Sequence, residues 1–328
     1  MVSTEPAAAQ FESFDALGHY FTTALISLAA GNSPERAARH AFFAQVGDML
    51  APLDATATAV RAIATLDAPD IAVGLSLAVG EYSMNKVFGL QLRDTLASTY
   101  LLSKMDAGTL EELIRIQQNL HSILPKGASM EVERNIARAI IAESHDEGSL
   151  MGDAVTGLAI HKLGDTYAHE GYGLLIGHGL DMHHPDKLFG RPAVRNAFVM
   201  DLAGTLLSAN KLDSSSDSVY LATKRYFTYT ANAWDGNDWA SDSLDSRFRF
   251  DASRDLNPQL GAGFLTRVPA VSPFLPYSST EAGLLGISPD VRYRMTGSQN
   301  VYRASDFVLQ AFDRFNTRVD YWREVFNR

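Results

Sequence analysis

The residue types that bind metal ions are concentrated in one segment of the chain, residues 149–186. Of the nine histidines, five lie there, and four aspartates accompany them; no other segment approaches this density. These residues are His161, His169, His178, His183, His184, Asp153, Asp165, Asp181 and Asp186. Imidazole and carboxylate groups are common ligands of transition metals, so the segment indicates a metal site.

The first half of this segment has the pattern of a helix. Ser149 is a suitable N-cap, and Gly171 supplies a C-terminal stop. At about 100° per residue, His161, Asp165 and His169 continue the apolar stripe of the earlier turns, so we expect them to face inward. Burying them is costly unless each is paired or bound to a metal. The alternative to a metal site is a buried row of hydrogen-bonded histidine and aspartate side chains.

The spacing of these three residues favours more than one ion. With a rise of about 1.5 Å per residue, the Cα atoms of His161 and His169 lie about 12 Å apart along the axis, too far to share one tetrahedral ion easily. Asp165 lies between them, where its carboxylate could bridge two ions about 3.5–4 Å apart.

The run LAIHKLGDTYAHEGYG, followed by GHGLDMHHPDK, resembles the metal-binding core of bacterial proteins related to zinc-dependent phospholipase C and S1/P1 nuclease. It is most similar to uncharacterised bacterial relatives that pair an early His-Tyr segment with a His-x3-Asp-x3-His helix. The resemblance covers roughly residues 15–50 and 135–210. It implies a helical fold with two or three zinc ions. The family's next histidine falls about two residues later than His169. The family also uses an N-terminal tryptophan as a ligand, which this chain lacks at its start.

The resemblance also implies a set of ligands. The GHYFTT segment matches the family's early histidine segment, and AQVGDM matches the segment that supplies an aspartate. The implied metal ligands are His19, Asp48, His161, Asp165, His169, His178 and His184, and the implied catalytic carboxylates are Asp48 and Asp165. Whether His40, Gln45, Asp153 or His183 also bind metal stays open.

The activity implied is zinc-dependent hydrolysis of a small-molecule or lipid phosphoester, as in phospholipase C. Two other interpretations remain. One is an HD-type phosphohydrolase centred on the adjacent pair His145 and Asp146, with His121 upstream. The other is a non-catalytic interaction module stabilised by metal. For His121 itself, a place near the end of a helix predicted from Thr109 favours interaction with that helix's last carbonyls rather than with metal.

Net charge and residue content exclude several kinds of partner and of metal ligand. The formal net charge of −10 argues against nucleic acid or anionic membranes as partners, because both attract lysine and arginine. The absence of cysteine excludes disulfides and thiolate ligands. No apolar run approaches the ~18 residues of a transmembrane helix, and no basic and hydrophobic leader is present. We therefore expect a cytoplasmic protein, or one exported without a cleaved signal peptide. Oligomeric state and substrate identity stay open.

These features predict an all-α fold, a multi-helix bundle around a buried metal cluster. We expect helices near residues 11–30, 34–50, 109–124, 131–145, 149–170, 192–210 and 305–326, with two or three more between residues 54 and 105. Residues 1–210 form the predicted metal-binding core. Residues 211–328 form a loop-rich, aromatic-rich extension whose final helix packs on that core.

Overall fold

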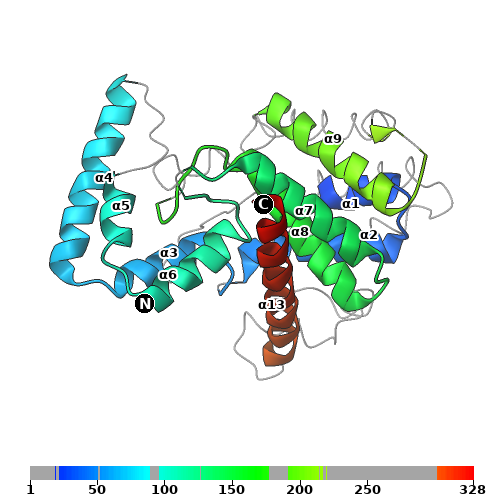
Figure 1. Ribbon diagram of the computed structural model, residues 1–328, viewed down its shortest axis with the longest axis horizontal. Coiled ribbons are helices and arrows are strands. Elements are labelled where there is room, and N and C mark those ends of the chain that lie inside the picture. The colour runs from blue at the N-terminus through cyan, green and yellow to red at the C-terminus, as the bar shows by residue number, and fades with distance from the viewer. Residues whose placement is uncertain are drawn as a thin grey trace, which may run out of the picture.

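The computed structural model describes residue 19 and residues 22–50, 52–88, 96–125, 127–176, 191–213, 215, 216, 219 and 301–328. Within these residues the protein is built from helices, and the only β-pairing is an isolated bridge between Leu124 and Gly173 (Figure 1). The predicted all-α class is confirmed. Among the described residues, no helix combines the length and apolar character needed to span a bilayer.

Helix α8 (Leu150–Ala168) is the centre of the bundle. It packs between α2 (Pro34–Met49) and α7 (Met130–His145), and it also contacts α9 (Pro192–Ala209) and α13 (Val301–Phe326) (Figure 1). Every residue from Gly152 to Thr166 is buried. The sequence predicted one inward stripe, but α8 is covered on all sides. Its polar side chains therefore face several different helices.

A glycine permits the close approach of α2 and α8. A Cβ added at Gly157 would lie 2.4 Å from the Cβ of Phe43 and 3.0 Å from the carbonyl oxygen of His40. Any larger residue would push these two helices apart. This crossing places the last turn of α2 beside the middle of α8.

Several helix boundaries follow the sequence signals. The Ser33 hydroxyl caps α2, accepting from Arg36 N at 3.3 Å, with Pro34 at the first helical position. The Ser149 hydroxyl caps α8, accepting from Gly152 N at 3.0 Å. Helices α7, α9 and α13 also match their predicted positions.

The helix predicted over residues 109–124 was wrong. Asp106 rather than Thr109 is the cap, because its carboxylate accepts from Thr109 N at 2.9 Å. Helix α6 (Ala107–Leu113) is then followed by a π-helix, η2 (Ile114–Gln118), whose wider turns end regular helical spacing. His121 therefore lies in a turn beyond η2.

The remaining helices are α1 (Thr22–Ala29), α3 (Ala55–Ala64), α4 (Ala68–Phe88) and α5 (Leu96–Leu102). Helix α1 packs on α2 and α9. Helices α4 and α5 pack together at one end of the molecule, and α3 and α6 connect them to the main bundle (Figure 1). Ala59, Ala62, Leu101, Leu113 and Leu175 form a small second core there.

Candidate metal centre

Five side chains from separate parts of the chain meet beside α8. They are His19, Asp48, His121, His161 and Asp165, which we call the His/Asp cluster. His19 precedes α1, Asp48 lies in the last turn of α2, His121 follows η2, and His161 and Asp165 lie one turn apart on α8. Each side chain is at most 3% exposed. These groups could hold a metal ion.

One half of the His/Asp cluster surrounds the Oδ2 atom of Asp165. His121 Nδ1 and His161 Nε2 each lie 3.1 Å from this oxygen and 3.0 Å from one another. Asp48 Oδ1 lies 3.7 Å from both of these nitrogens. Two imidazoles and two carboxylates therefore face one small volume.

The other half involves His19 and the second oxygen of each carboxylate. His19 Nε2 lies 3.1 Å from Asp165 Oδ1 and 3.8 Å from Asp48 Oδ2. The rings of His19 and His161 stack with centroids 4.1 Å apart. Asp48 and Asp165 thus each present one oxygen to His19 and the other to the His121 and His161 pair. This is the arrangement expected of carboxylates that bridge two neighbouring ions.

Backbone carbonyl groups determine the tautomers of two of these histidines. His161 Nδ1 lies 2.7 Å from the carbonyl oxygen of Ala44, and His121 Nε2 lies 2.8 Å from that of Leu53. A carbonyl oxygen only accepts, so both of these nitrogens carry a proton. In the neutral rings, His161 Nε2 and His121 Nδ1 then present lone pairs to one another and to Asp165. Three acceptors this close repel one another unless a proton or a metal ion lies among them.

In the other half of the cluster, burial disfavours a proton on His19. Desolvation, assisted by the nearby His161, lowers the pKa of His19 to about 3. Burial also opposes ionisation of Asp165, but His161, His169 and the hydrogen bond with His121 outweigh it and hold the Asp165 pKa well below its usual range. An ionised carboxylate beside a neutral imidazole is the state in which both groups bind metal.

Two helical glycines make room for the imidazoles. A Cβ added at Gly47 would lie 3.2 Å from both Cε1 and Nε2 of His161. A Cβ added at Gly164 would lie 3.0 Å from Cε1 of His19. Each histidine ring therefore packs directly against the backbone of a glycine. Neither glycine has a left-handed conformation, so the reason for glycine here is the lack of space for a side chain.

We predict that Gly47→Ala separates metal binding from fold stability. In a helix, alanine is more stable than glycine by up to about 1 kcal/mol. At position 47, however, its methyl group would contact His161 Nε2 closely. The apoprotein should keep its thermal stability, while the zinc dissociation constant rises at least about tenfold, as when a ligand's supporting contacts are lost. Isothermal titration with zinc measures this.

Gly80→Ala is the matched control, because a Cβ at Gly80 on α4 would have no neighbour within 4 Å. It should leave zinc affinity unchanged. Equal zinc affinity in the Gly47 and Gly80 variants would contradict the conclusion that His161 needs the space beside Gly47.

His169 and Gln45 adjoin the His/Asp cluster through Asp165 and Asp48 respectively. Helix α8 ends at Ala168, so His169 is the C-cap rather than a further member of the helical row. Its Nδ1 donates to the carbonyl oxygen of His121 at 2.7 Å and lies 3.7 Å from Asp165 Oδ2. Gln45 Nε2 donates to Asp48 Oδ2 at 3.4 Å. The predicted ligands His178 and His184, and the open candidate His183, lie outside the described residues.

His121 is the residue that the sequence interpretation missed. It was expected to interact with the last carbonyls of its own helix, but its Nε2 donates to Leu53 across the core and its Nδ1 faces Asp165. A detectable signal was present, because His121 interrupts the apolar run of Leu120, Ile123 and Leu124. A histidine buried among such residues needs a partner.

His40 and Asp153 belong to a second buried polar group. Asp153 accepts from Arg36 Nε at 2.8 Å and Arg39 Nη1 at 2.9 Å, while His40 Nε2 lies 3.7 Å away. Burial works against ionisation, but His40 and the two arginines lower the Asp153 pKa to about 2. The two guanidinium groups supply the positive charge here. They make this group unsuited to a metal ion.

The His145 and Asp146 pair does not form a joint site. His145 is buried and its Nε2 lies 2.8 Å from Asn32 Oδ1. The Asp146 side chain is 60% exposed and lies 3.5 Å from Lys211 Nζ. The two side chains point to different surroundings, so this geometry gives the HD-type interpretation no support.

Comparison with known proteins adds no relative. No family model matches the sequence, and no curated protein or solved structure matches it significantly. The functional argument therefore rests on the His/Asp cluster itself.

Proposed function

We propose that this protein is a zinc-dependent hydrolase of phosphodiester or phospholipid substrates, similar in chemistry to phospholipase C. The observation that carries the proposal is the set of facing acceptors: His121 Nδ1, His161 Nε2 and Asp165 Oδ2 lie within 3.0–3.1 Å of one another. The resemblance of the surrounding sequence supplies the reaction class.

The donor atoms suit zinc in number, type and spacing. Zinc binds imidazole nitrogen and carboxylate oxygen at about 2.0–2.2 Å, so neighbouring ligand atoms in a tetrahedral site lie about 3.3 Å apart. The contacts among His121, His161, Asp165 and Asp48 range from 3.0 to 3.7 Å, on both sides of that value. Small shifts of the side chains would bring His121, His161 and Asp165 into coordination, with Asp48 Oδ1 3.7 Å from both imidazole nitrogens.

Ions held by the His/Asp cluster would supply Lewis acidity toward a phosphoryl oxygen and would lower the pKa of a water molecule. The chain's own residues would fix the geometry. Asp48 and Asp165 each offer both oxygens, one to each half of the cluster. The Gln45 amide donates to Asp48 Oδ2 at 3.4 Å and restrains its rotation.

Burial of the cluster favours a second candidate, a non-catalytic module that metal stabilises. None of the five side chains is more than 3% exposed, which is typical of closed structural sites. A catalytic site must leave one position open to water and substrate. Activity assays therefore decide between the two candidates.

The assay offers choline and ethanolamine phospholipids, a bis-aryl phosphodiester and single-stranded nucleic acid in parallel. The net charge of −10 disfavours the nucleic acid. Hydrolysis should disappear with a chelator and return with zinc. If protein carrying its full complement of zinc cleaves none of these substrates, the hydrolase is rejected in favour of the metal-stabilised module.

A further inference from the structure

The turn that carries His121 has an unusual backbone. It follows the π-helix η2, and Ser122 adopts a left-handed conformation with φ of 51°. Serine in this region is strained, and such strain persists only where surrounding contacts hold it. Because π-helices and strained residues concentrate at functional sites, the contacts that hold this turn are informative.

Side chains from two other helices hold the turn. Lys162 of α8 donates through Nζ to the carbonyl oxygen of Gln118 at 3.1 Å, and Ser122 Oγ donates to the carbonyl oxygen of Lys162 at 3.1 Å. Asn119 is held from α13: its Oδ1 accepts from Arg323 Nη1 at 2.8 Å. Its Nδ2 donates to Asn316 Oδ1 at 2.9 Å. The turn is thus fixed on both sides of His121.

Arg323 is partly buried and belongs to a charge network with the buried Glu133 and Lys162. It donates to both oxygens of Glu133, at 3.1 and 2.9 Å, and Glu133 also lies 2.6 Å from Lys162 Nζ. Buried ion pairs of this kind add little net stability compared with apolar packing, so their better-attested role is to specify one geometry.

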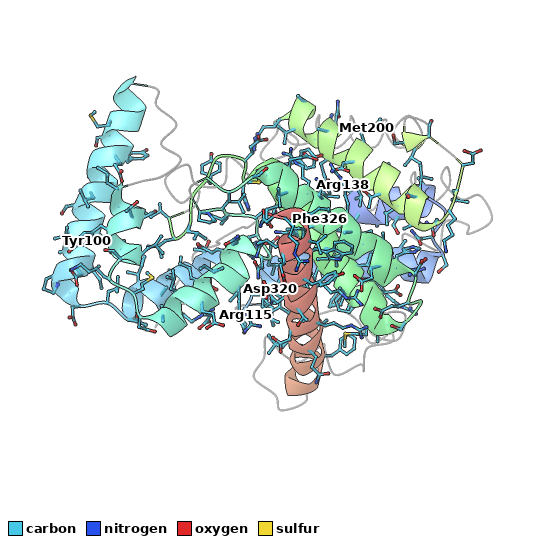
Figure 2. The ribbon with its side chains drawn as sticks, in the orientation of Figure 1. Tyr100, Arg115, Arg138, Met200, Asp320 and Phe326 are labelled. Carbon is cyan, nitrogen blue, oxygen red and sulfur yellow. The ribbon has the colours of Figure 1, made fainter. Side chains whose placement is uncertain are left out.

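We infer that Arg323 is a positioning residue for His121, acting through Asn119, and that the C-terminal helix is thereby a structural part of the metal centre. The inference rests on the proposed metal site. Figure 2 labels Asp320 and Phe326 on α13, the helix that lies over α7 and α8, and Arg323 lies between them in sequence. From this position Arg323 contacts Asn119, which lies two residues before the proposed metal ligand His121.

Charge and position predict opposite effects of removing Arg323. Because two cations repel each other, loss of the Arg323 charge near the metal site would by itself strengthen binding of the metal ion. By the positioning argument, loss of the Asn119 contact lets the turn relax, moves His121 Nδ1 away and weakens binding. The sign of the change in affinity therefore separates the two effects.

The experiment compares Arg323→Ala with Arg318→Ala. Arg318 is also a partly buried arginine of α13, but it pairs with Glu143, Glu147 and Ser144 of the α7 region, away from the cluster. Both variants should lower thermal stability. Only Arg323→Ala should raise the zinc dissociation constant, by about 10–100-fold, the usual range for contacts that orient a ligand. It should also change the visible absorption spectrum of the cobalt-substituted protein, which reports coordination geometry.

Asn316→Ala keeps the test open if Arg323→Ala fails to fold, because it removes one acceptor and leaves the charge network intact. It should weaken zinc binding and alter the cobalt spectrum in the same direction. Unchanged or tighter zinc binding in these variants would overturn the inference, as would equal weakening in Arg318→Ala. A wild-type protein that binds neither zinc nor cobalt would instead reject the metal centre itself.

Discussion

Replacing Asp165 by asparagine is expected to lower zinc-dependent phosphodiester hydrolysis by on the order of 10³-fold. Asp165 presents Oδ1 to His19 at 3.1 Å and Oδ2 to His121 and His161 at 3.1 Å. Asparagine keeps the shape but loses the negative charge and one acceptor oxygen, so it cannot bridge two ions. Rates of hydrolysis at saturating zinc, measured for the wild type and the variant, give the change directly.

His145→Ala is the control for this experiment. His145 is a buried histidine that contacts Asn32 and lies outside the His/Asp cluster. Its replacement should leave hydrolysis at saturating zinc near the wild-type rate. A loss comparable with that of Asp165→Asn would transfer the site to the His145 and Asp146 pair, and an active Asp165→Asn would remove the support for a bridging carboxylate.

His161→Ala is expected to abolish the stabilisation of the protein by zinc. A ligand at 1,000 times its dissociation constant stabilises the folded state by about 4 kcal/mol, which raises Tm by on the order of 10 °C. His161 lies at the junction of both halves of the cluster, stacked on His19 and 3.0 Å from His121 Nδ1. His161 belongs to both groups of side chains that could hold an ion, one with His19 and Asp48 and one with His121 and Asp165. Its loss should therefore abolish the zinc-dependent shift in Tm.

His40→Ala is the matched comparison for that shift. Both histidines are fully buried in the same helical core, but His40 faces Ser27 and Asp153. Its loss should lower the Tm of the apoprotein through the cavity it leaves. The increase in Tm on adding zinc should persist. If both variants lose that increase, zinc acts on the fold in general rather than at the His/Asp cluster.

The local signals in the sequence were sufficient for most helices. Ser33 and Ser149 cap α2 and α8 as their sequences predict, because capping depends only on residues within one turn. The i, i+4 spacing of His161 and Asp165 also placed both on one side of α8. These are short-range relations, which a single sequence records well.

The features that the sequence did not predict depend on contacts between residues far apart in the chain. His121 reaches the His/Asp cluster through the π-helix η2 and the strained Ser122, and neither leaves a periodic pattern. The network from Arg323 to Asn119 joins residues 204 positions apart. Helix α8 ends at Ala168, two residues before its predicted end, so His169 is the C-cap and its Nδ1 donates to the carbonyl oxygen of His121. In each case tertiary contacts decided the position of the side chain.

A crystal grown with zinc, and measured for anomalous scattering at the zinc absorption edge, tests the central claim most directly. We expect one peak among His121 Nδ1, His161 Nε2 and Asp165 Oδ2, and a second among His19, Asp48 and His161, beside Asp165 Oδ1. No peak at the cluster, with the imidazole rings and Asp165 in direct hydrogen-bond contact, would contradict the metal centre. It would leave a buried row of paired histidine and aspartate side chains.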